Sequence, residues 1–152
     1  MWFVIFFAFV VDVKILEPFV GYVDGASHST QNLSSATWAK FAPSGELVSF
    51  QGICISHSMN NIAKYSTLIE HLFDAISLGI RRIIVRPNSQ LIVLQLTSVY
   101  TVRNQTILYM FLRVRLLERH FEYIQYQHIS RNFNTLTDSL ANYVLNRHLL
   151  HM

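Results

Sequence analysis

The sequence predicts an α/β domain with a mixed five-stranded sheet, three antiparallel strands followed by two parallel ones, flanked by helices. Three strand-like runs come first, and beyond residue 60 helical apolar patterns alternate with short strands. A strand, a helix and another strand in succession imply a parallel crossover. With 152 residues, of which 51% are hydrophobic, the chain is long enough for one domain with a substantial core.

The first predicted strand leads to an aspartate. Val20, Tyr22 and Val23 favour a strand, and Gly25 permits a sharp exit after Asp24. A carboxylate at a strand end is where an open sheet presents chemistry, although an aspartate in an ordinary turn is the common alternative. The elements expected next are a polar loop over 27–35, a strand over 36–41, a turn over 43–46 and a strand over 47–55.

The second half of the chain changes to a helical period. Asn60 or Asn61 is expected to cap a helix that ends at Gly79. The elements expected after it are a buried strand over 81–86, a helix over 89–96, a helix over 106–120, a strand over 121–128 and a final helix over 135–149.

Residues 1–17 are predicted to be an apolar extension, and residues 18–152 the domain. The unbroken apolar run at the start is too short to span a bilayer. An added strand or helix, or an upstream start joined to the domain, is favoured over a signal peptide, because the run lacks a preceding positive segment and a following cleavage site. A single cysteine, Cys54, cannot form an internal disulfide. These features predict an intracellular protein, in the cytoplasm or the nucleus, without a stable membrane span.

The charge balance mildly favours an anionic partner, because the formal net charge is +3. Scattered arginines are candidates for phosphate contacts, and solubility is their ordinary role. The histidines show no metal-ligand spacing, which favours core or surface roles for them. The arginines are Arg81, Arg82, Arg86, Arg103 and Arg131, and the histidines are His57, His71, His120, His128, His148 and His151.

Four local motifs resemble those of the ribonuclease H fold, in the family's order and at its spacing, from about Phe19 to Asn146. VDGAS at residues 23–27 resembles the first-strand signature, and NNIAKY at 60–65 resembles the opening of the first helix. NSQL at 88–91 resembles the segment after the fourth strand, and HISRNFNTLTDSLAN at 128–142 resembles the family's ending. The residues of these motifs most resemble those of the plant reverse-transcriptase-like domain of retrotransposons.

The resemblance implies cleavage of the RNA strand of an RNA/DNA hybrid by two Mg²⁺ ions, with Mn²⁺ as an alternative, held by four acids. Position by position, these acids correspond to Asp24, Lys64, Asn88 and Asp138. Two carboxylates and one ammonium leave a formal charge of −1 where the family has −4. So little charge would hold a pair of divalent ions weakly. We therefore expect impaired catalysis, with Asp24 and Asp138 as the remaining metal ligands.

The implied partner is an RNA/DNA hybrid or another double-stranded nucleic acid. The matching positions for substrate contacts are Asn60, Asn61, Ser89, Gln90, Arg131 and Asn134. Helix caps and turns are the alternative roles for several of them. Lys64 is placed to meet a phosphate if no metal is bound. Two other functions stay open at this point: an active metal-dependent endonuclease that uses Asp24 and Asp138, and an inert interaction module.

Overall fold

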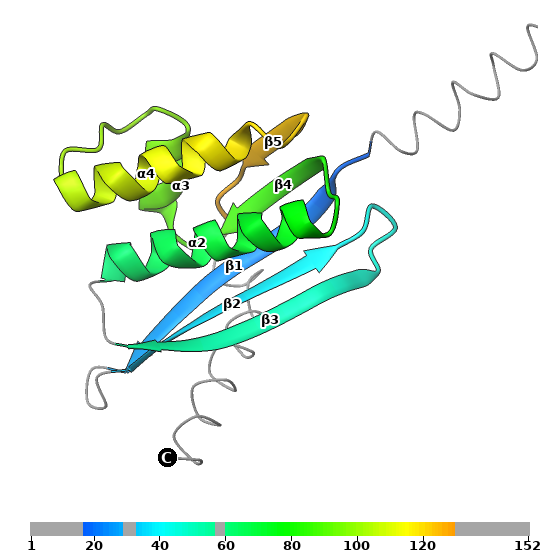
Figure 1. Cartoon of the computed structure of the whole chain (residues 1–152), viewed down its shortest axis with the longest axis horizontal. Coiled ribbons are helices and arrows are strands. Elements are labelled where there is room, and N and C mark those ends of the chain that lie inside the picture. Colours follow the sequence, from blue (N-terminus) through cyan, green and yellow to red (C-terminus); the bar gives the residue numbers. More distant parts are fainter. Residues whose placement is uncertain (1–16, 29–32, 57–59, 130–152) are drawn as a thin grey trace, which may run out of the picture.

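A computed structural model describes residues 17–28, 33–56 and 60–129 (Figure 1). Within these ranges, only the backbone is described for residues 25–28, 33–35, 53–56 and 60, so the side chain of Cys54 is not among the described ones. The apolar run, the predicted final helix over 135–149 and the candidate residues Arg131, Asn134 and Asp138 lie outside the described residues.

Within the described residues, five strands form one mixed sheet in the order β3-β2-β1-β4-β5. Antiparallel pairs join β1 to β2 and β2 to β3, whereas parallel pairs join β1 to β4 and β4 to β5. This topology confirms the predicted fold class. The strands are β1 (Phe19–His28), β2 (Leu33–Phe41), β3 (Leu47–Ser56), β4 (Arg82–Pro87) and β5 (Tyr123–Tyr126).

The predicted loop over 27–35 is wrong, because most of that stretch belongs to strands. β1 continues to His28 and β2 begins at Leu33, with Ser27 opposite Ser34 in the antiparallel register. Polar side chains led to the expectation of a loop, but backbone hydrogen bonds, which any non-proline residue makes, extend the pairing. At the other end of the sheet β5 is shorter than expected, since Phe121 N–H still bonds to Glu118 O at 3.0 Å.

The three helices of the described ranges lie on the same side of the sheet, and the core fills the space between them and the strands (Figure 1). Gly79, at a φ of +75°, ends the first of them, as expected from the sequence. Tyr65, Leu68 and Leu72 are at most 1% exposed and pack toward the sheet. None of the helices in the described part of the chain has the length and apolarity needed to cross a membrane. The helices are α2 (Asn60–Ser77), α3 (Gln90–Leu96) and α4 (Gln105–Glu118).

Candidate functional site

Asp24 lies on β1, the central strand, at the point where its parallel neighbour ends. Val23 is opposite Pro87, the last residue of β4, while Asp24 is still paired with Thr37 of β2. The expected strand end at Asp24 is therefore the end of the β1–β4 pairing, and β1 itself runs on. The residue is only 2% exposed, so its carboxylate is largely shielded from solvent.

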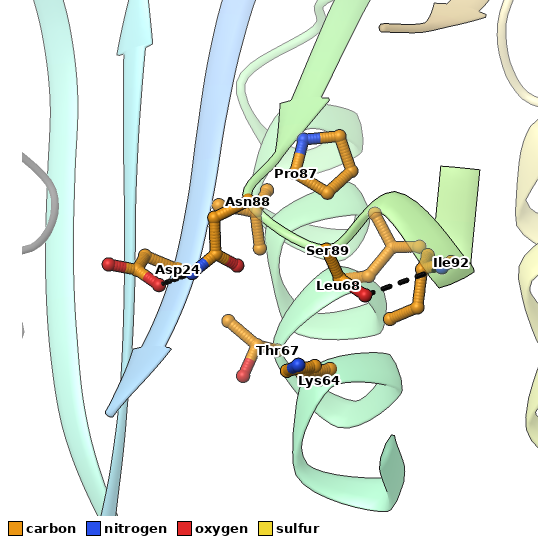
Figure 2. A pocket seen from close by; sticks show the side chains of 9 residues that line it. Asp24, Lys64, Thr67, Leu68, Pro87, Asn88, Ser89 and Ile92 are labelled. Atoms are coloured by element: carbon orange, nitrogen blue, oxygen red, sulfur yellow. Dashed lines mark hydrogen bonds between the residues drawn. The ribbon is translucent and has the colours of Figure 1, made fainter. Parts of the chain in front are cut away.

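Asn88 follows β4 and lies beside Asp24. Its backbone N–H donates to the carbonyl of Val23 at 3.2 Å, which continues the β1–β4 pairing by one residue. Its side-chain amide donates to Oδ1 of Asp24 (Figure 2). Main-chain pairing thus places the side chains of Asn88 and Asp24 next to each other. The amide of Asn88 is neutral, so it leaves the negative charge of Asp24 in place and uses one carboxylate oxygen as its acceptor.

Lys64 and Thr67 come to the same place from α2, one helical turn apart (Figure 2). Together with Asp24, Asn88 and Ser89 they line a small pocket at this edge of the sheet. Thr67 Oγ1 donates to the carbonyl of Ala63 at 2.8 Å, whereas Lys64 is half-buried and belongs to neither ion pair of the described residues. The described residues that line the pocket therefore include one carboxylate and one ammonium.

Of the residues predicted to contact substrate, Ser89 has a clear structural role. It is the N-cap of α3, its hydroxyl accepts from the N–H of Ile92 at 3.3 Å, and it is 7% exposed (Figure 2). Gln90 begins α3 and is exposed, and Asn61 is exposed in the first turn of α2, next to Asn60, where the helix begins. The substrate contacts of these residues stay predictions.

The described pocket residues do not fit a pair of divalent cations. Among the described residues no cluster of three or more histidine, cysteine, aspartate or glutamate side chains exists. Asn88 turns its donor N–H group toward Asp24, and Lys64 adds a positive charge where a hard cation requires oxygen ligands and negative charge. No acid of the described residues besides Asp24 lines the pocket, and Asp138 lies outside the described part of the chain, so magnesium stays a prediction.

A second polar cluster, which the sequence did not predict, lies between the sheet and α2, and its residues do not line the pocket. Lys40 of β2 is fully buried and donates to Oδ2 of Asp74 at 2.7 Å, and its ammonium lies 3.0 Å from Nδ1 of His71. Ser49 and Trp38 donate to the same carboxylate oxygen, at 3.0 and 3.3 Å. These five residues, the Lys40 cluster, connect β2 and β3 to α2.

Burial and the contacts among its residues together shift the pKa values of the Lys40 cluster. Burial lowers the pKa of Lys40 to about 8, although the hydrogen bond to Asp74 and the charge of Asp74 oppose the shift. Burial alone would raise the pKa of Asp74, but the hydrogen bond and charge of Lys40, with the bonds from Ser49 and Trp38, lower it instead. His71 is completely buried, and burial together with the charge of Lys40 holds its pKa well below the ordinary value of 6.5.

The imidazole of His71 also touches the backbone of β1. A Cβ built on Gly21 would lie 2.3 Å from Nε2 of His71, a separation that real side chains do not tolerate. Nδ1 faces the donor Lys40, so the ring carries its hydrogen on Nε2, which has no hydrogen-bond partner in the described residues. His71 is thus a core histidine, as the sequence favoured.

Among the arginines considered for phosphate contacts, Arg86 is already engaged. It donates to the hydroxyl of Tyr22 at 2.9 Å and to Oε1 of Gln127 at 3.2 Å. Arg82 lies over the ring of Tyr123, with Cζ 4.9 Å from the ring centre. Both side chains thus contribute to packing on the sheet. This role is different from the two considered from the sequence, which were phosphate contacts and solubility.

Comparison with known proteins gives consistent matches. Residues 22–144 match the model of the family described as "Reverse transcriptase-like". Ribonuclease HI of the archaeon Halobacterium salinarum is 32% identical over 124 residues, which is 82% of this chain and 62% of that protein. The chain therefore spans less than two thirds of the length of that curated relative.

Solved structures agree with the sequence matches. The crystal structure of RNase H1 from Halobacterium salinarum superposes with a TM-score of 0.80 at 30% identity, covering 86% of this chain and 98% of that one. LC11-RNase H1, solved in complex with an RNA/DNA hybrid, superposes with a TM-score of 0.79 at 26% identity, covering 86% and 99%. The predicted plant retrotransposon origin and the domain boundary at residue 17 stay predictions.

Proposed function

Because this chain belongs to the reverse transcriptase-like family and has the ribonuclease H fold, we propose that it binds RNA/DNA hybrids and is impaired in cleaving them. The single observation that carries the impairment is the composition of the pocket at the end of β4. There the amide of Asn88 donates to Asp24, and Lys64 lines the same space. Binding of a hybrid is supported by the similar protein that was solved with one.

The impairment follows from charge. A two-metal hydrolytic site needs carboxylates to hold both cations and to offset their mutual repulsion. Replacing a carboxylate by an ammonium removes one negative charge and adds a positive one, and the neutral amide of Asn88 removes another. Bound metal is worth several kcal/mol to such a reaction, which is on the order of 100-fold or more in rate. We therefore expect the loss of metal to leave binding but little cleavage.

An active endonuclease is the second candidate, and one observation favours it. Asp24 is buried at the point where the pairing of β1 with β4 ends. The hydrogen bond from the backbone N–H of Asn88 to the carbonyl of Val23 extends this pairing by one residue, so the Asp24 carboxylate keeps its place at this edge of the sheet. In this candidate Asp24 and Asp138 hold one ion, and the substrate phosphate supplies further oxygen ligands. A domain without catalysis and without affinity for nucleic acid is the outcome if neither candidate holds.

The test compares cleavage of an end-labelled RNA/DNA hybrid, with Mg²⁺ or Mn²⁺, by the chain and by the double variant Lys64→Glu, Asn88→Asp. We expect the double variant to cleave on the order of 100-fold faster, since both changes restore negative charge to the pocket. Asp24→Asn, made in each background, is the control that assigns the activity to this site. Cleavage by the unaltered chain that Asp24→Asn abolishes would refute the impairment and establish the second candidate.

A further inference from the structure

We propose that Lys64 binds a backbone phosphate of nucleic acid directly, so that this pocket contacts its ligand without a divalent metal. The inference rests on the proposed function and deepens it, since it identifies the ligand group and the residue that receives it. In this proposal the ammonium of Lys64, in place of a metal ion, is the positive charge that faces the phosphate. The pocket is then an anion site built from hydrogen-bond donors.

The first argument is the electrostatic position of Lys64. The side chain is half-buried, and the ion pairs of the described residues are Lys40 with Asp74 and Arg115 with Glu118. Lys64 therefore has no salt-bridge partner in the part of the chain that the structure describes. A cation that is partly removed from water gains more from an approaching anion than a fully exposed one does, because the effective dielectric constant is lower.

The second argument is the chemistry of the groups around the ammonium. The pocket is lined by the amide of Asn88 and the hydroxyl of Ser89, besides Lys64 (Figure 2). An amide nitrogen has two donor hydrogens, of which Asn88 gives one to Asp24, and the Ser89 oxygen that accepts from Ile92 still carries its own hydrogen. Phosphate oxygens only accept, so a phosphate matches this set of donors.

Among the described residues that line the pocket, Asp24 is the group that opposes an anion, and its surroundings limit the opposition. Asp24 is 2% exposed, and the amide of Asn88 donates to its carboxylate. An incoming phosphate would meet the ammonium on α2 and the amide after β4, and this amide already donates one hydrogen to the carboxylate. Contacts of this kind position a nucleic acid without reading its sequence, and they weaken steeply with salt.

The experiment measures binding of a fluorescently labelled RNA/DNA hybrid by anisotropy, in EDTA, over a series of salt concentrations. The unaltered full chain should bind without metal. Lys64→Gln should weaken binding about tenfold, the value expected for one hydrogen bond to a charged group, and should reduce the salt slope by about 0.9. Asn88→Asp, which changes little in shape, should also weaken binding in EDTA, because it gives Lys64 an acidic partner and adds repulsion.

The matched control is Arg119→Gln, which removes one positive charge from an exposed position. Arg119 follows α4 and precedes β5, whereas Asn88 follows β4, so the two lie at opposite ends of the parallel strands. The control should change the affinity far less than Lys64→Gln. Circular dichroism of each variant excludes unfolding as the cause of lost binding.

Each other outcome is decisive. Equal affinity of the unaltered chain and Lys64→Gln in EDTA would overturn the role of Lys64 and leave hybrid binding intact. Binding that appears only when Mg²⁺ is added would overturn metal independence and return the pocket to a metal site. Failure to bind the hybrid with or without Mg²⁺ would refute the proposed function itself, and the inference with it.

Discussion

Removing the titratable ring of His71 should change how stability depends on pH. In the folded protein His71 is completely buried beside the ammonium of Lys40, and both conditions hold its pKa well below 6.5. In the unfolded chain the ring is free to take up a proton near its ordinary pKa. Below that pH the unfolded state binds one more proton than the folded state, so the free energy of unfolding falls as the pH falls.

The size of the effect follows from proton linkage. While the folded ring stays neutral, each pH unit below the unfolded pKa costs about 1.4 kcal/mol of stability, and between pH 7.5 and pH 5 the loss from this residue amounts to about 2 kcal/mol. His71→Gln removes the titration, and its side-chain oxygen keeps an acceptor for Lys40.

The assay is urea denaturation followed by circular dichroism at the two pH values, for the chain and for His71→Gln. The variant is expected to lose about 2 kcal/mol less between pH 7.5 and pH 5 than the unaltered chain. His120→Gln, at an exposed position after α4, is the matched control for the exchange of a histidine for a glutamine. An identical pH dependence of the chain and His71→Gln would show that the ring is protonated in the folded state, against this reasoning.

Three further substitutions test the packing around the sheet by urea denaturation. Gly21→Ala should lower the free energy of unfolding by about 1–3 kcal/mol, because the added Cβ would overlap His71. An unchanged urea midpoint would show that the ring of His71 moves aside freely. Asp74→Asn should lower the free energy of unfolding by about 3 kcal/mol, since it leaves the buried Lys40 without its anion. Ser49→Ala, which removes one hydrogen bond to Asp74, should lower it by about 1 kcal/mol, and a smaller effect of Asp74→Asn than of Ser49→Ala would contradict this. Ser89→Ala should cost about 1 kcal/mol through the lost cap, and the exposed Ser44→Ala, the control, almost nothing.

The element order could be predicted from the sequence because its signals are local. Apolar period and turn residues identify the strands and helices, and Gly79 ends α2 where expected. The polar continuation of β1 to His28 could not be predicted in this way, because backbone pairing with β2 holds it and no apolar alternation marks it. Strand boundaries in polar stretches thus depend on partners that are distant along the chain.

The candidate pocket was predictable as a set of positions, and its internal bonding was not. Motif spacing identified Asp24, Lys64 and Asn88, which the structure places around one pocket. The hydrogen bond from Asn88 to Asp24 joins residues 64 positions apart and depends on the parallel register. The Lys40 cluster had a weak signal, since Lys40 shares a strand face with Trp38, but its contact with Asp74 spans 34 positions and needs the tertiary fold.

The backbone bond from Asn88 to Val23 separates the architecture of the pocket from its chemistry. Because main-chain atoms make this bond, any non-proline residue at position 88 can keep it, and the side chain at that position is delivered beside Asp24 whatever its charge. Substitutions at this position are therefore expected to change the charge of the pocket while the backbone pairing of β1 with β4 is kept. For protein engineering, position 88 is thus a place where the group beside Asp24 can be exchanged without a change in the backbone.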